Sequence, residues 1–147
     1  CELEIDEATG AVQLVRYTVY DDVGRLINPL LVKGQIHGGI VQGAGQALME
    51  NFVTDPDTGQ VLTGSFADYC MPRADDFCSF DVHGNVCPTA VNPLGVKGAG
   101  ESGTVGALAA VMSAVNDALS QAGCDYLQMP ATPDRVWHSL RDAGSRS

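Results

Sequence analysis

One glutamate lies where a glycine-rich turn, residues 95–103, runs into a predicted helix. Such a turn exposes backbone N–H groups to an anionic or polar ligand. The helix dipole favours an ionised carboxylate at this position, whereas burial would favour the protonated form. These opposed effects suit Glu101 as a general base. An ordinary acidic residue in a first helical turn gives the same pattern, and residue types alone favour that simpler interpretation.

The same turn contains the pattern GxGxxG, at Gly98, Gly100 and Gly103, which is similar to a dinucleotide-binding fingerprint. A nucleotide-binding unit needs a hydrophobic strand just before the turn and an acidic residue at the end of a second strand. Residues 91–94 are poor strand sequence, and Asp125 follows a predicted helix with no strand between them. The sequence therefore disfavours an NAD site.

A second segment, residues 34–46, carries three glutamines among five glycines in an otherwise apolar predicted helix. A glutamine side chain both donates and accepts, which suits Gln35 and Gln42 to contacts with the edge of a heterocycle. A seam of small residues between two helices explains the same pattern, and spacing alone slightly favours it. His37 has no second histidine at metal-ligand spacing, so a structural hydrogen bond is its favoured role.

These segments belong to a predicted α+β fold, in which hairpins pack with a glycine-rich helix and a buried alanine-rich helix. Alternating apolar and polar residues at 3–5 and 12–20 predict a β-hairpin. Asn followed by Pro starts the glycine-rich helix, expected over residues 30–52. The alanine-rich helix is expected over residues 102–119 and a short last helix over 134–142.

Shorter signals complete the predicted fold. Residues 55–59 are typical of a hairpin tip, residues 61–69 are expected to be partly extended, and residues 80–82 indicate a strand. Helical spacing predicts one apolar face on the alanine-rich helix, and alanines on its opposite face indicate burial on most sides. The predicted apolar face consists of Val105, Leu108, Ala109, Met112, Val115 and Leu119.

Composition excludes several classes of protein. The 147 residues carry a net charge of −10, so the chain gains nothing from neutralising phosphates and a nucleic-acid partner is disfavoured. No apolar run is long enough for a membrane span, and no signal peptide is evident. The five cysteines form no CxxC pair, which predicts free thiols, no metal site and a cytoplasmic location. The start at Cys1 suggests a piece of a longer protein.

Taken together, five segments resemble the molybdenum hydroxylases, the family of xanthine dehydrogenase, aldehyde oxidoreductase and aerobic carbon monoxide dehydrogenase. The resemblance covers nearly the whole chain up to the last helix. It identifies residues 1–147 as a C-terminal fragment of the molybdopterin-binding domain of the large subunit. The matching segments are residues 21–29, 34–43, 62–69, 71–74 and 92–101.

The resemblance implies specific roles for residues of this chain. Glu101 matches the family's catalytic glutamate, which takes a proton from a water-derived oxygen that attacks an electron-poor carbon. Gln35 matches a glutamine that hydrogen-bonds the pterin, and Gly34 and Gln42 are expected to approach the cofactor. No residue is expected to ligate the metal. The turn that places the glutamate near the metal consists of Lys97, Gly98, Ala99 and Gly100.

The resemblance also implies cofactors and partners outside this chain. The parent subunit would hold molybdopterin with molybdenum, in the cytosine dinucleotide form, and this chain alone would bind neither. Electrons would leave through 2Fe-2S clusters and FAD on partner subunits. The upstream half of the subunit would complete the site for a small-molecule substrate, and its loss would leave apolar surface through which the isolated chain self-associates. The alternative is a non-catalytic binding or assembly module of the same family.

Overall fold

The computed structural model describes residues 1–145, so residues 146–147 of the predicted domain lie outside the described residues. Strands and helices are mixed, which confirms the predicted α+β class. A single 3-10 turn, η1, covers Ala74–Asp76. The strands are β1 (Glu2–Ile5), β2 (Val12–Asp21) and β3 (Phe80–Gly84), and the helices are α1 (Pro29–Leu48), α2 (Ser102–Gln121) and α3 (Pro133–Gly144).

The three strands form one sheet in the order β1-β2-β3. β1 and β2 pair antiparallel, which confirms the predicted hairpin, and β3 pairs parallel to β2 with Phe80 opposite Tyr17. The hairpin turn packs against the start of α3, because a Cβ on Gly10 would lie 2.0 Å from the Pro133 carbonyl oxygen. Gly10 also has a φ of +73°, which side chains rarely adopt.

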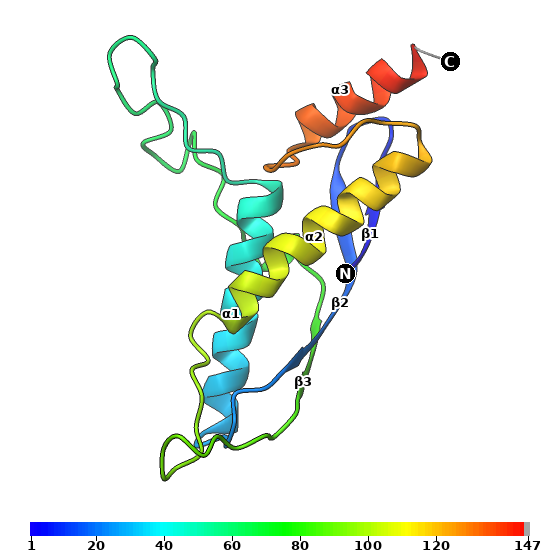
Figure 1. Ribbon diagram of the computed structural model, residues 1–147. Coiled ribbons are helices and arrows are strands. Elements are labelled where there is room, and N and C mark those ends of the chain that lie inside the picture. The colour runs from blue at the N-terminus through cyan, green and yellow to red at the C-terminus, as the bar shows by residue number, and fades with distance from the viewer. Residues whose placement is uncertain (146–147) are drawn as a thin grey trace.

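Helices α1 and α2 cross in close contact, and Figure 1 shows α2 passing over α1. A Cβ added to Gly103 would lie 2.5 Å from the Ile36 carbonyl oxygen, and one added to Gly43 would lie 2.8 Å from the Ala107 Cβ. The crossing is therefore possible only with small residues at these positions. A helix–helix seam, one of the two explanations for the glycine-rich helix, accounts for Gly39 and Gly43, which face Gly103 and Ala107 of α2.

The crossing helices and the sheet enclose one hydrophobic core, since residues of α1, α2 and β2 pack into a single buried cluster. α1 contributes Ile40 and Ala44, and both are fully buried. β2 contributes Leu14 and Tyr17, with the Tyr17 ring edge-on to Phe80 at 5.8 Å between centroids. The fully buried α2 residues are Ala107, Val111, Val115 and Leu119.

Helix α1 ends at Leu48, so its predicted end at Phe52 is wrong. The Ala47 carbonyl, which would accept from residue 51 in a longer helix, instead accepts a hydrogen bond from the Ala131 N–H at 2.7 Å. Phe52 lies beyond the helix and is 66% exposed. A tertiary hydrogen bond to Ala47 therefore ends the helix earlier than its apolar pattern predicts.

The predicted apolar face of α2 is also partly wrong, as is its predicted burial on most sides. Val105 is 67% exposed and Ala109 is exposed, whereas Ala107 and Val111 are fully buried. The contact with α1 runs along Gly103 and Ala107, and this contact turns the buried face toward Val111. Within this chain, α2 keeps one side open.

The segment between α1 and β3 contains little regular structure. Thr54 and Val61 form an isolated antiparallel bridge around the predicted hairpin tip, so the segment expected over 61–69 is paired at its first residue, and residues 66–68 form a turn. Figure 1 shows this segment projecting away from the body of the molecule. It exposes several large apolar side chains, as does the start of α1. They include Ile27, Leu30, Leu31, Phe52, Leu62, Phe66 and Met71.

The described residues carry few features of other protein classes. No described helix combines the length and apolar character that a membrane crossing requires. All five cysteines are free thiols. The His37 ring lies edge-on to Phe80 of β3, with 5.6 Å between ring centroids, which places it against the sheet.

We predict that Gly103→Ala destabilises the protein by about 1–3 kcal/mol, because its methyl group would collide with α1 backbone at the crossing. Gly106→Ala on the same helix meets no atom within 4 Å and should stabilise by about 0.5–1 kcal/mol through helix propensity. Urea denaturation of both variants measures the difference. Equal stability of the two variants would contradict the proposed crossing.

Candidate functional site

Glu101 occupies the N-cap position of α2, yet its side chain makes no capping hydrogen bond. The residue is exposed, and its backbone carbonyl accepts from the Val105 N–H at 3.1 Å. The carboxylate is thus not used to hold the helix end and remains accessible for chemistry. It borders an open depression that is lined by Gly98, Gly100, Glu101, Ser102, Val105 and Gly106.

Backbone contacts fasten the turn that leads to Glu101 onto the loop after β2. Gly24 and Val96 form an antiparallel bridge, and the Lys97 N–H donates to the Val23 carbonyl at 3.0 Å. The Arg25 N–H donates to the Gly95 carbonyl at 2.9 Å. Two distant parts of the sequence therefore form one rigid support at the start of the turn.

A side-chain contact reinforces this support. The Lys97 ammonium group donates to one carboxylate oxygen of Asp22, and the other oxygen accepts from the Gly24 N–H at 2.9 Å. The hydrogen bond from Lys97, with that from the Gly24 backbone, lowers the pKa of Asp22 below its ordinary value. The same pairing with Asp22 raises the pKa of Lys97. Both groups are therefore charged at neutral pH.

The glutamines of α1 contact the other end of the turn. The Gln35 side-chain amide donates to the Gly100 carbonyl at 2.9 Å. The Gln42 side-chain oxygen accepts from the Thr104 hydroxyl at 3.3 Å. The structure therefore brings Gln35 next to the residue that precedes Glu101, and it places Gln42 beside the first turn of α2.

Several glycines of the candidate site leave room for a ligand. A Cβ added to Gly34, Gly98 or Gly100 would meet no atom of this chain within 4 Å. Ala99 is half-buried, and its carbonyl accepts from the Ser102 hydroxyl at 3.2 Å. Packing does not require glycine at these three positions, which differs from the α1–α2 seam. Their backbone can thus approach a cofactor closely, and the residues present fit a large polar group such as a pterin.

Three supporting residues were not singled out from the sequence as site residues. They are Asp22, Thr104 and Asn92, whose side chain donates to the Val96 carbonyl at 2.9 Å and accepts from the Val96 N–H at 3.3 Å. Aspartate two residues before a glycine is a turn signal, and it could have indicated that Asp22 caps its own loop. Its contact with Lys97 spans 75 positions of sequence and has no local signal.

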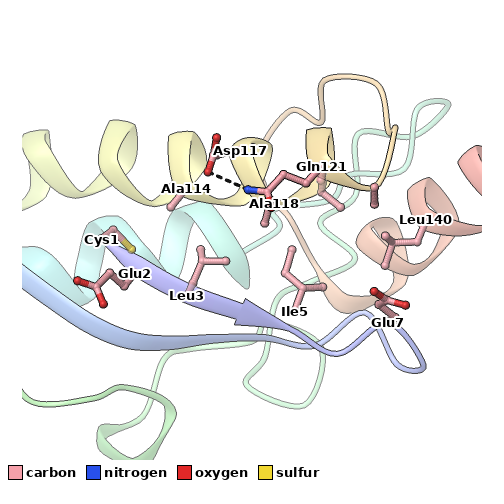
Figure 2. Close-up of a pocket in the computed structure, with 12 residues that line it drawn as sticks. Cys1, Glu2, Leu3, Ile5, Glu7, Ala114, Asp117, Ala118, Gln121 and Leu140 are labelled. Atoms are coloured by element: carbon pink, nitrogen blue, oxygen red, sulfur yellow. Dashed lines mark hydrogen bonds between the residues drawn. The ribbon is translucent and has the colours of Figure 1, made fainter.

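Other places in the described residues offer less chemistry. Residues 1–145 hold no group of three or more His, Cys, Asp or Glu side chains able to bind a metal ion. Val96 pairs with Gly24 only through an isolated bridge, so no strand of a dinucleotide-binding unit precedes Gly98. Figure 2 shows another hollow, between β1 and α2, into which Leu3 and Ile5 point. No candidate site residue lines that hollow.

Residues 1–78 match the molybdopterin cofactor-binding domain family. This chain belongs to that family. The match confirms the resemblance to the molybdenum hydroxylases that the sequence segments predicted. It covers the hairpin, α1 and the loop that follows, whereas Glu101 lies beyond the matched residues.

Individual relatives extend the similarity over nearly the whole chain. It is 43% identical over 134 residues to the nicotine 6-hydroxylase large subunit of Paenarthrobacter nicotinovorans, covering 91% of this chain and 16% of that protein. It is 37% identical over 142 residues to the carbon monoxide dehydrogenase large chain of Hydrogenophaga pseudoflava, covering 97% and 18%. The crystal structure of quinoline 2-oxidoreductase from Pseudomonas putida 86 matches with a TM-score of 0.90 at 38% identity, covering 95% and 18%.

The chain therefore spans less than a fifth of the length of these relatives. Its backbone arrangement is similar to one part of the much longer quinoline 2-oxidoreductase chain. The candidate site is open to solvent, because the turn and the exposed glutamines face away from the core of this chain. Such exposure is consistent with a chain that covers less than a fifth of its relatives.

The lowered pKa of Asp22 predicts how stability depends on pH. A carboxyl whose pKa is lower in the folded state stabilises the fold at neutral pH, and this contribution is lost as the pH falls below about 4. We expect a small contribution, since both partners are about one-third exposed. Melting temperatures of the wild type and Asp22→Asn should differ at pH 7, and the difference should shrink as the pH falls further below about 4. A difference that is independent of pH would contradict this assignment.

Proposed function

We propose that this chain is the base-bearing part of the large subunit of a molybdenum-dependent hydroxylase. The observation that carries the proposal is Glu101, an exposed carboxylate without a capping bond at the edge of a glycine-lined depression. Similarity to the large subunits of a nicotine hydroxylase and a carbon monoxide dehydrogenase supports the same class of reaction. Its substrate is an aldehyde or N-heterocycle carbon, or carbon monoxide, with water as the oxygen source.

In this proposal, Glu101 is the general base. Its carboxylate accepts the proton of the water-derived oxygen as that oxygen bonds to the electron-poor carbon of the substrate. The carboxylate makes no capping hydrogen bond to the first turn of α2, so its oxygens are available to this proton. The bound molybdenum cofactor supplies the oxidation–reduction chemistry that protein side chains lack.

The remaining candidate residues hold and orient the cofactor. The Gln35 amide group already donates to the Gly100 carbonyl, so its side-chain oxygen is the atom that accepts from the pterin. Gly34, Gly98 and Gly100 allow close approach of the backbone, and Gln42 contacts the cofactor from the same helix as Gln35. Lys97 and Ala99 belong to the turn that sets the position of the base.

The proposal extends to groups beyond this chain. The cofactor is molybdopterin in its cytosine dinucleotide form, and the rest of the subunit completes its site. Iron–sulfur and FAD subunits carry the electrons away, and the complex works in the cytoplasm, where cysteines stay reduced. The exposed apolar side chains of the loop between α1 and β3 pack against the rest of the subunit.

We predict that Glu101→Gln in the full enzyme lowers kcat by about a hundredfold to ten-thousandfold, the usual contribution of a general base. Glutamine keeps the size of the side chain but cannot take the proton. Steady-state kinetics with the enzyme's substrate, alongside elemental analysis for molybdenum, measure the loss at constant cofactor content.

A matched control is Glu4→Gln, which changes an exposed glutamate on β1 that lies outside the candidate site. This variant should keep wild-type turnover. Normal turnover in Glu101→Gln with a full complement of molybdenum would exclude Glu101 as the base. It would leave the non-catalytic binding module as the better account of the chain.

A further inference from the structure

We propose that Asp22 is a positioning residue that sets the place of Glu101 by holding Lys97. This inference rests on the proposed role of Glu101 as the base. Asp22 lies on the loop after β2, far from Glu101 in the sequence. It bonds Lys97, from which the turn runs to Glu101.

The turn needs anchors because its own sequence does not fix its shape. Gly98 and Gly100 flank Ala99, and glycine gives the backbone access to conformations that other residues avoid. Neither glycine has an atom of this chain within 4 Å of where a Cβ would be, so packing does not restrain them either. The position of Glu101 therefore depends on contacts at the two ends of the turn.

Side chains anchor the turn at both ends, in addition to the bonds that Asn92 makes with Val96 just before Lys97. At the end next to α2, the Gln35 amide donates to the Gly100 carbonyl at 2.9 Å. At the other end, Asp22 uses both carboxylate oxygens, one for the Lys97 ammonium group and one for the Gly24 N–H. Gly24 pairs with Val96, the residue before Lys97. Asp22 therefore holds the Lys97 side chain at the same bridge that holds the backbone next to Lys97.

The contact is better suited to positioning than to stability. The side chains of Asp22 and Lys97 are 34% and 35% exposed, and exposed ion pairs stabilise a fold only slightly. A displacement of about 1 Å in a catalytic group, in contrast, lowers a rate by about a hundredfold. Loss of the pair should therefore reduce turnover much more than it reduces thermal stability.

The test uses the full enzyme with Asp22→Asn, which keeps an oxygen for the Gly24 N–H but removes the charge that holds Lys97. We expect kcat to fall about tenfold to hundredfold, with KM and molybdenum content unchanged. Hydrogen exchange of residues 97–101 should become faster. The control, Asp81→Asn, removes an exposed ion pair with Arg16 at 3.4 Å on the sheet, and it should alter neither readout.

Two further variants show whether Asp22 acts through Lys97. Lys97→Met alone should lower kcat by about the same factor as Asp22→Asn, and the double variant should lose no more than either single variant. A melting temperature that changes no more than in Asp81→Asn separates positioning from general destabilisation. If the kcat losses of the two single variants multiply in the double variant, Asp22 does not act through Lys97.

Other outcomes separate this inference from the proposed function. Wild-type kcat in Asp22→Asn beside an inactive Glu101→Gln would overturn positioning by Asp22 and leave the base in place. Loss of molybdenum in Asp22→Asn would also overturn it, because the residue would then serve cofactor loading. If Glu101→Gln keeps its activity, hydrogen exchange of residues 97–101 tests whether Asp22 holds the turn. Unchanged exchange in Asp22→Asn would then overturn the role of Asp22 as an anchor.

Discussion

The close crossing of α1 and α2 brings the glutamines of α1 beside the turn that carries Glu101. Backbone atoms meet at Gly39, Gly43 and Gly103, so a single added methyl group at Gly103 would fall 2.5 Å from a carbonyl oxygen. The N-terminal end of α2 is thereby brought beside α1. This contact places the Gln35 amide next to the Gly100 carbonyl and so relates the turn before Glu101 to the glutamines of α1.

The sequence predicted the features that depend on local chemistry. Apolar alternation predicted the hairpin, and Asn28 followed by Pro29 predicted the start of α1. Tertiary contacts caused the errors. The bond between Ala131 and Ala47 ended α1 early, and the seam with α1 rotated the buried face of α2 away from Val105.

The candidate site was also predictable only where local residue patterns indicate it. Gln35 and Glu101 were singled out from residue types and from family resemblance, and the structure brings their segments together. The pattern could not separate two kinds of glycine in one helix. Gly43 is required by packing, whereas Gly34 has open space and remains available to a ligand. The contact between Asp22 and Lys97 spans 75 positions of sequence, a separation that no local pattern encodes.

Metal content is the most direct measure of whether these residues form part of a molybdenum site. The full-length protein that contains this chain should be purified with its partner subunits and analysed for molybdenum and for released pterin. We expect stoichiometric molybdenum with a pterin cofactor in the assembled protein. An assembled, folded protein that contains neither molybdenum nor pterin would contradict it.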